Sequence, residues 1–295
     1  MPLRIVQSKQ NSRLKLLRQA LARPGCNGLA VGVEGANLLS EALRSGLHAS
    51  TIFVAEGSEH LVDQMTGRGT LYPLSDKTEI LVLPRRLLDA AQTTEAPQPI
   101  AALIDAPQWQ WSDLEAVESA HGSIARQTAR QRQGPILVLA AVQDPGNLGT
   151  ILRSAEAFGA AGVLSLPGTV SVWNPKTLRA SAGSAFRVPV VAARPDEAFA
   201  WLQASGRRIW STAVDEAQSV TAVDLTTPLA LIIGNEGGGV AAEIAAQAHG
   251  LLTIPCPGAV ESLNAAVATS ILLYEVARQR TNSSLPLPRP RGAKQ

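Results

Sequence analysis

From Pro135 onward, short apolar runs alternate with stretches of helical periodicity, and this alternation is the strongest constraint on the fold. Apolar strands separated by helices need crossover connections, which give a largely parallel sheet covered on both faces. The sequence therefore predicts an α/β domain over residues 135–280 that ends in one long helix, 261–280. The predicted strands are 136–142, 162–166, 188–192, 208–214, 229–233 and 251–255.

Residues 1–106 form a second, smaller predicted α/β unit. A basic amphipathic helix is predicted over residues 1–23, ended by PGCNG at 24–28, and its apolar side is Leu14, Leu16, Leu17 and Leu21. Four strands and two helices are predicted after it: strands 29–33, 50–55, 71–75 and 100–106, and helices 37–45 and 85–91. Residues 107–134 are interpreted as a partly helical linker, and residues 281–295 as a disordered tail.

The composition excludes several classes of protein. A hydrophobic content of 45% with 17% charged residues is typical of a globular chain. There is no apolar run long enough to span a membrane, and the first residues lack the features of a secretory signal. The two cysteines, Cys26 and Cys256, form no CxxC pair, so we expect neither a disulfide scaffold nor a bound metal. A cytoplasmic location is expected.

The net charge is only +2, but the basic residues are unevenly distributed. Residues 1–33 hold six Lys and Arg and no acidic residue, and residues 157–195 are also basic and free of acids. Such blocks suit a polyphosphate partner, including nucleic acid. The same residues could equally be solvated cations that are scattered over the folded surface.

Three loops that mix glycines with polar residues follow predicted strands. They are DPGN at 144–147 with Arg153 just beyond, GNEGGG at 234–239, and PCPGAVESLN at 255–264. In open parallel sheets, ligands bind outside the carboxyl ends of the strands. Glycines let the backbone approach a ligand closely, and the polar side chains can orient it. The sequence therefore predicts one ligand site at this edge of the sheet.

Each loop also has a purely structural interpretation, which the residues alone leave open. Asn147 could cap its helix, and Ser262 and Asn264 could cap the last helix. The glycine run could be only a tight turn with Glu236 exposed on it, and Arg153 could extend its charge to the surface. The case for a site rests on all three loops falling at strand ends of one sheet.

The three loops resemble the three motifs of the SpoU-type RNA 2′-O-ribose methyltransferases of the SPOUT superfamily. The matching stretches are DPGNLGTILRSAEAFG (144–159), LIIGNEGGGV (231–240) and IPCPGAVESLNAAVATSILLYEV (254–276), and NPKTLRASAGSAFRVPV (174–190) is also similar. One departure is Cys256, where a methionine is common. VGVEGANLLSEAL, more loosely, resembles the family's N-terminal substrate-binding domain.

The resemblance implies a fold, a cofactor and an assembly. The fold is a C-terminal SPOUT α/β domain with a deep trefoil knot and a largely parallel sheet, preceded by a smaller N-terminal α/β/α substrate-binding domain. The cofactor is S-adenosylmethionine, and the protein is a homodimer in which catalytic residues lie near the partner's cofactor site. The implied cofactor-binding residues are Gly234, Ile254 and Leu263, and the implied catalytic residues are Asn147, Arg153, Glu236, Ser262 and Asn264.

Arg153 is the family's candidate for activating the ribose hydroxyl. A guanidinium has a pKa above ~12 and is effectively never deprotonated in a protein. We therefore favour a role for Arg153 in orienting the ribose and the adjacent phosphate, while another group accepts the proton.

The extended basic N-terminus before the substrate domain resembles the family's ribosomal-RNA members more than its minimal tRNA members, which favours large-subunit 23S rRNA over tRNA as the substrate. The residues expected to contact it are Arg13, Lys15, Lys176, Arg179 and Arg187. Two further hypotheses stay open. A dinucleotide-binding oxidoreductase should carry GxGxxG after its first strand, and this sequence does not. A non-catalytic RNA-binding relative should have lost Arg153, Glu236 or Asn264, which are all present.

Overall fold

The computed structural model describes residues 3–23, 30–66, 74–115, 134–260 and 262–282. The chain divides into two compact units. Unit 1 comprises Met1–Trp109, Asp144–Arg153 and Val170–Pro189, and unit 2 comprises Gln110–Gln143, Ser154–Thr169 and Val190–Gln295. Two segments of the predicted C-terminal domain therefore belong to the same compact unit as the N-terminal sheet.

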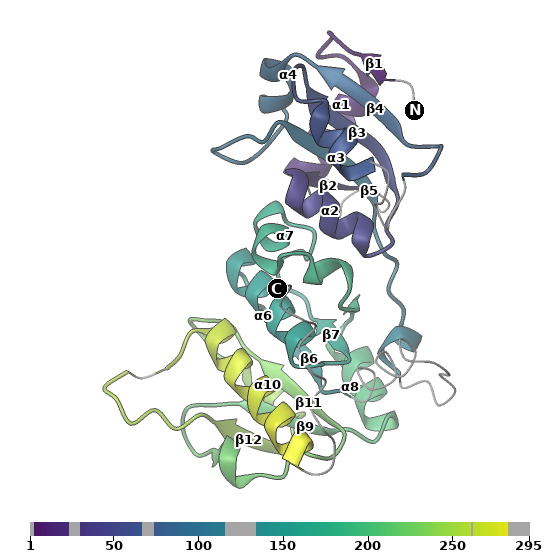
Figure 1. The fold of residues 1–295 in the computed structure, drawn as a ribbon. Helices are drawn as coiled ribbons and strands as arrows, with labels where there is room; N and C mark the ends of the chain where they lie inside the picture. The colour runs from purple at the N-terminus through teal and green to yellow at the C-terminus, as the bar shows by residue number, and fades with distance from the viewer. Residues whose placement is uncertain (1–2, 24–29, 67–73, 116–133, 261, 283–295) are drawn as a thin grey trace, which may run out of the picture. The chain divides into compact units, whose positions relative to one another are not determined.

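Unit 1 contains a five-stranded mixed sheet in the order β1-β4-β3-β5-β2 (Figure 1). β1, β4 and β3 run parallel, whereas β5 is antiparallel to both β3 and β2. The strands are β1 (Leu3–Ile5), β2 (Ala30–Glu34), β3 (Ala49–Ala55), β4 (Glu79–Leu83) and β5 (Ile100–Asp105). The helices before residue 110 are α1 (Ser12–Ala22), α2 (Ala36–Arg44), α3 (His60–Thr66) and α4 (Arg85–Asp89).

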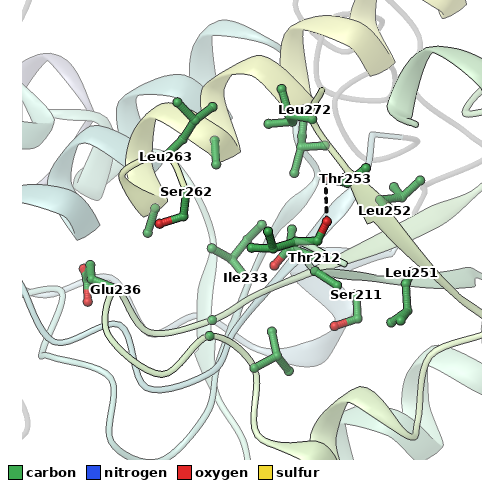
Figure 2. Close-up of a pocket in the computed structure, with 18 of the residues that line it drawn as sticks. Ser211, Thr212, Ile233, Glu236, Leu251, Leu252, Thr253, Ser262, Leu263 and Leu272 are labelled. Atoms are coloured by element: carbon green, nitrogen blue, oxygen red, sulfur yellow. Dashed lines mark hydrogen bonds between the residues drawn. The ribbon is translucent and has the colours of Figure 1, made fainter. Parts of the chain in front are cut away.

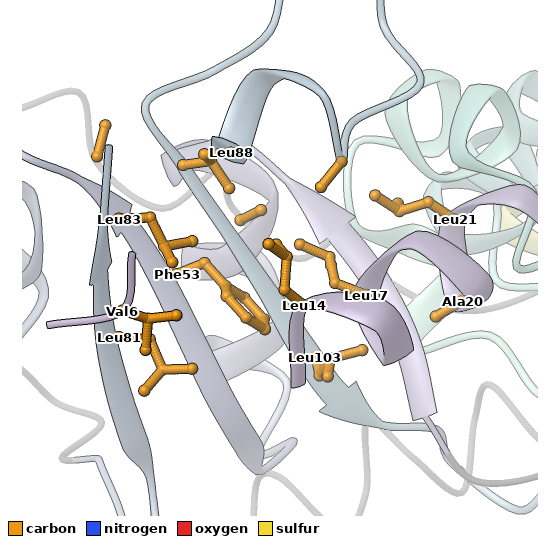
Figure 3. Close-up of a cluster of buried hydrophobic side chains, with 13 residues drawn as sticks. Val6, Leu14, Leu17, Ala20, Leu21, Phe53, Leu81, Leu83, Leu88 and Leu103 are labelled. Atoms are coloured by element: carbon orange, nitrogen blue, oxygen red, sulfur yellow. The ribbon is translucent and has the colours of Figure 1, made fainter. Parts of the chain in front are cut away.

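One hydrophobic cluster of this unit lies between the sheet and helices α1 and α4 (Figure 3). Its buried side chains include Leu14, Leu17, Phe53, Leu88 and Leu103. α1 approaches β2 closely at Gly32. A Cβ on this residue would lie only 2.8 Å from the side chain of Leu21, so the absence of a side chain allows the approach. Successive strand residues face opposite sides, so Val33 points to the other face, where α2 contacts β2 and β5. The unit therefore has helices on both faces of its sheet.

The expectation of one helix over residues 1–23 is wrong in its first part. Residues 3–5 form β1, which pairs with β4, and α1 begins only at Ser12. Asn11 sets this start, because its side chain accepts hydrogen bonds from the backbone N–H groups of Arg13 (2.9 Å) and Leu14 (3.2 Å). The predicted apolar side of the helix is buried at Leu14, Leu17 and Leu21 and partly buried at Leu16.

Of the other elements predicted for residues 24–106, most are confirmed and one is not. The strands expected at 29–33, 50–55 and 100–106 and the helices at 37–45 and 85–91 are confirmed as β2, β3, β5, α2 and α4. The strand expected at 71–75 is not: residues 71–73, like the break at 24–28, lie outside the described residues, and Leu74 and Ser75 belong to no strand. The structure instead has α3 and β4, which the sequence analysis does not predict.

Unit 2 contains a seven-stranded sheet in the order β10-β12-β9-β11-β6-β7-β8, and every described pair in it is parallel. The strands are β6 (Ile136–Leu139), β7 (Gly162–Ser165), β8 (Val190–Ala192), β9 (Arg208–Thr212), β10 (Gln218–Ser219), β11 (Leu229–Ile233) and β12 (Gly250–Thr253). The largely parallel sheet is confirmed, and all six expected strands form. Leu139 pairs with Ile233, so the loops after β6 and β11 leave the sheet at one edge.

The helices after residue 134 are α6 (Pro145–Ala157), α7 (Pro175–Ser181), α8 (Pro195–Ala204), α9 (Ala242–Ala245) and α10 (Ala265–Asn282). α10 was expected to begin at residue 261, but it begins at Ala265, and Glu261 itself is outside the described residues. Within the described helices, none combines the length and the apolar character needed to cross a membrane. Of the expected linker, Trp111–Leu114 form a short 3-10 helix, and residues 116–133 lie outside the described part, as do residues 283–295 of the tail.

Candidate active site

A cavity of about 810 Å³ lies in unit 2, at the carboxyl ends of β9, β11 and β12 and beside the start of α10 (Figure 2). Its wall is formed mainly by residues 211–214, 233–240 and 251–256. Five of the eight residues predicted for catalysis and cofactor binding line it: Gly234, Glu236, Ile254, Ser262 and Leu263. The two loops predicted after β11 and β12 therefore meet at one cavity.

The glycine loop after β11 is a tight turn that also forms part of this cavity wall. The backbones of Asn235 and Gly239 exchange two hydrogen bonds of 2.9 Å. A Cβ on Gly234 would overlap the backbone of Gly239 and Val240, so only glycine fits there. Asn235 fixes the turn to the end of β6, since its Nδ2 donates to the carbonyl oxygen of Ala141 (2.9 Å). The tight-turn and ligand-site interpretations of this loop are thus compatible.

Asn264 stands at the boundary between the cavity loop and α10. Its Oδ1 accepts hydrogen bonds from the backbone N–H groups of Ala266 (2.9 Å) and Val267 (3.3 Å). The helix-capping interpretation of Asn264 is therefore confirmed, and the residue is not among those that line the cavity. Ser262 and Leu263, which precede it, do line the cavity (Figure 2).

Asn147 and Arg153 both belong to α6, in the part of that helix assigned to unit 1. Neither is among the residues that line the cavity, and Arg153 is exposed. The cap of α6 is Asp144 rather than Asn147, because Asp144 Oδ1 accepts a hydrogen bond from the Asn147 backbone N–H (2.8 Å). Its Oδ2 pairs with Lys176 Nζ at 3.1 Å. Asp144 was not predicted as the cap, although an Asp before a Pro at the first helical position is a common start signal.

We expect Asp144→Ala to lower the free energy of unfolding by about 1 kcal/mol at neutral pH, the usual cost of losing an N-cap. The backbone hydrogen bond from Asn147, and after it the bond from Lys176, holds the pKa of Asp144 below its ordinary 3.8. A depressed carboxyl pKa stabilises the fold above the ordinary value and ceases to do so as the pH falls through the lowered one. Urea unfolding should show the two proteins converging only below pH 3.8. A difference that stays unchanged as the pH is taken well below 3.8 would contradict the ionic part of this account.

The basic residues predicted to contact RNA mostly have carboxylate partners. Lys15 lies exposed on α1. The other four form the ion pairs Arg13–Glu79 (2.7 Å), Lys176–Asp144 (3.1 Å), Arg179–Glu34 (2.9 Å) and Arg187–Glu41 (3.0 Å). The pairing reduces the net positive charge that the four could offer to a phosphate.

The end of β9 contributes to the cavity as well, and the sequence analysis did not single it out. Thr212 lines the cavity, and its hydroxyl donates to the carbonyl oxygen of Ile232 (3.1 Å). Val214 and Val260 also line it and are 59% and 60% exposed, which leaves apolar surface around the cavity uncovered. The sequence could have pointed to Thr212, because residues 208–214 were predicted as a strand of the same parallel sheet. β9 indeed runs parallel to β11 and ends at the same edge.

The protein has an α/β fold with a cavity at the carboxyl ends of parallel strands, which is where proteins of this architecture bind their ligands. The sequence model of the SpoU rRNA Methylase family matches residues 134–274. The chain is 34% identical over 244 residues to the 23S rRNA (guanosine(2553)-2′-O)-methyltransferase RlmP of Bacillus subtilis, covering 83% of this chain and 87% of the relative. It is 31% identical to the 23S rRNA (uridine(2479)-2′-O)-methyltransferase of Streptomyces viridochromogenes, covering 68% of each chain.

The similar solved structures are also methyltransferases of this kind. The SpoU methyltransferase AviRb from Streptomyces viridochromogenes, in complex with AdoMet, superposes with a TM-score of 0.77 at 26% identity, covering 92% of this chain and 98% of that one. The AdoMet-bound rRNA methyltransferase from Sinorhizobium meliloti gives a TM-score of 0.75 at 26% identity, with 94% and 98% covered. The chain belongs to the SpoU rRNA Methylase family, as its three loop motifs predict. This membership rules out the dinucleotide-binding oxidoreductase.

Proposed function

We propose that the protein transfers a methyl group from S-adenosylmethionine to the 2′-hydroxyl of a ribose in 23S rRNA. The observation that carries the proposal is the cavity at the strand ends, whose walls include two of the three loops that resemble the family's motifs. The named relatives act on 23S rRNA, which favours this substrate over tRNA. A cytoplasmic location follows from such a substrate.

The residues around the cavity fit S-adenosylmethionine. Gly234 has no room for a side chain, because the backbone of Gly239 and Val240 lies where its Cβ would be, and its main chain lines the cavity. We assign cofactor binding to the main chain at Gly234, Ile254 and Leu263, all of which line the cavity. The bound cofactor supplies a methyl group already activated on a sulfonium, so the protein has mainly to position the two reactants.

We assign the ordering of the catalytic site to Asn147, Glu236, Ser262 and Asn264. Arg153 holds the attacking ribose and its neighbouring phosphate, because a planar guanidinium with fixed donors suits a phosphate oxygen pair. Its charge persists at neutral pH, which leaves another group to accept the hydroxyl proton. By the family resemblance, Asn147 and Arg153 act at the cofactor site of a partner subunit.

A homodimer is part of the proposal. α10 exposes three large apolar side chains, Val267 (47%), Ile271 (36%) and Tyr274 (54%), which recur at helical spacing. Exposed apolar side chains grouped on one helix are typical of a surface that another protein covers. We propose that a second copy of the chain covers this face.

We expect Ile271→Asp to convert the protein from a dimer to a monomer, because it places a charge in the proposed apolar contact. Light scattering at micromolar concentration measures the mass directly. Lys77→Asp, which changes the charge of an exposed residue in a loop of unit 1, is the control and should leave the dimer intact. A wild-type protein with the monomer mass would reject the proposed assembly.

The remaining elements of the fold proposal come from the composition of the chain and from the family resemblance. Residues 1–106 form the substrate-binding domain, 107–134 the linker, 135–280 the methyltransferase domain and 281–295 the tail. A deep trefoil knot is proposed for the C-terminal segment. We propose Arg13, Lys15, Lys176, Arg179 and Arg187 as RNA contacts. An arginine that gives one nitrogen to a carboxylate still keeps other N–H donors for a phosphate.

The test is methyl transfer by the purified protein from labelled S-adenosylmethionine to protein-free 23S rRNA, with tRNA and 2′-deoxy oligonucleotides as comparisons. We expect label in 23S rRNA alone. Cofactor binding without transfer to any RNA would revive the non-catalytic relative. Transfer to tRNA alone would replace the proposed substrate.

A further inference from the structure

A carboxylate of the N-terminal sheet is buried against α7, within unit 1. Glu34 ends β2, and its side chain is only 2% exposed. Its Oε2 accepts a hydrogen bond from Nη1 of Arg179 on α7 (2.9 Å), and its Oε1 accepts one from the backbone N–H of Thr93 (2.7 Å). A buried carboxylate is costly unless it is paired and hydrogen-bonded. The burial of Glu34 therefore favours the arrangement in which Arg179 is held in place.

A second contact fixes the same segment on the N-terminal sheet's helix α2. Nη1 of Arg187 donates to Oε2 of Glu41 (3.0 Å) and to the hydroxyl of Ser45 (3.1 Å). The backbone at Gly183, which has φ of +91°, lies directly against α2, because a Cβ there would be 2.7 Å from the Cβ of Glu41. Two ion pairs and one close backbone approach thus attach the segment that contains α7 to β2 and α2.

α7 in turn packs directly on α6. A Cβ on Gly149 of α6 would lie 2.6 Å from the carbonyl oxygen of Thr177 and 2.9 Å from the backbone nitrogen of Ser181. Both of these α7 residues are fully buried. Such close contact transmits small displacements, because packed interiors hardly compress. Gly149 lies between Asn147 and Arg153 on the same helix, so the place of α7 sets the place of both side chains.

We propose that Glu34 is a positioning residue for methyl transfer. Through Arg179 and α7, it holds the part of α6 that carries Asn147 and Arg153. The N-terminal domain then both binds RNA and fixes the catalytic side chains that act on it. This inference rests on the proposed function. It assigns Glu34 no contact with RNA or with the cofactor.

The test compares Glu34→Gln, Arg179→Met and the double variant with wild type, at a temperature well below unfolding. Because a displacement of about 1 Å can cost about 100-fold in rate, we expect each single variant to lower kcat by about 10- to 100-fold. The double variant should be no slower than the slower single one, because both changes break one contact. The cofactor Kd, measured by calorimetry, should stay within about twofold, since the cavity lies in unit 2.

Amide hydrogen exchange gives a readout that does not depend on activity. Both single variants should speed exchange in peptides covering residues 145–153 and 175–181. Asp89→Asn is the matched control: it breaks the Arg85–Asp89 ion pair (2.7 Å) on α4 and should change neither exchange nor kcat.

Three results would overturn the inference: unchanged exchange in α6, a kcat equal to wild type in Glu34→Gln, or a kcat equal to wild type in Arg179→Met with only the KM for RNA raised, which would make Arg179 only an RNA contact. A failure of the proposed function looks different. In that case the wild type itself methylates no 23S rRNA, and exchange in α6 still decides the role of Glu34.

Discussion

Arg153→Ala is expected to lower methyl transfer to RNA by about 100-fold or more, the size of effect seen when a group that stabilises the transition state is removed. Cofactor affinity should stay nearly unchanged, because Arg153 is not among the residues that line the cavity. Single-turnover kinetics with saturating RNA, together with calorimetry for the cofactor, separate the two quantities. A variant that loses cofactor binding would place Arg153 in the cofactor pocket and reject the division of roles proposed above.

Arg153→Lys distinguishes a positioning role from a catalytic base. Lysine keeps the charge but loses the planar fork, so we expect a fall comparable to that in Arg153→Ala. A positioning arginine adds no titration of its own between about pH 6 and 9. If Arg153 were the base, the wild-type rate would rise with pH. In the lysine variant, this rising part of the pH–rate profile would move along the pH axis by an amount set by the pKa of the lysine. Such a shift would establish the base role instead.

Gly234→Ala should abolish measurable binding of S-adenosylmethionine and lower the free energy of unfolding by about 1–3 kcal/mol, the usual range for overpacking. The added methyl group would overlap the backbone of Gly239 and Val240, so the turn that forms the cavity wall must open. Calorimetry measures the affinity, and urea unfolding measures the stability. The effect is expected even though the substitution adds a single carbon.

Asp76→Glu is the control for this substitution. It also adds one carbon, at an exposed position in the turn before β4 in unit 1. Its affinity and stability should match those of the wild type. Wild-type cofactor affinity in Gly234→Ala would mean that the cavity is not the cofactor site.

The parallel sheet could be predicted because its signal is local and repeated. Strands such as β6 and β11 are continuous apolar runs, and helices separate most of them. The N-terminal strand β1 escaped prediction for a physical reason. β1 has only three residues, all exposed, and exists because its backbone pairs with the edge of β4. Three exposed residues contain no pattern that could predict pairing with β4, which lies more than 70 residues further along the chain.

The candidate site was predictable to the extent that glycines and strand ends mark it. Gly234 and Leu263 were found from their motifs, and both line the cavity. Thr212 was missed, because nothing in its own residue type points to a ligand. Glu34 was also missed as an individual residue, since its importance comes from Arg179, a partner 145 positions away in the chain. Contacts of this range depend on the folded topology and leave no local signal.

The central claim is that the protein places a 2′-O-methyl group on 23S rRNA. Alkaline hydrolysis tests it directly in rRNA from cells with and without the gene, because a methylated 2′-oxygen cannot attack the adjacent phosphate. We predict one protected position in 23S rRNA that becomes cleavable when the gene is removed and is protected again by wild type but not by Arg153→Ala. Identical cleavage patterns in 23S rRNA from the two strains would contradict the claim.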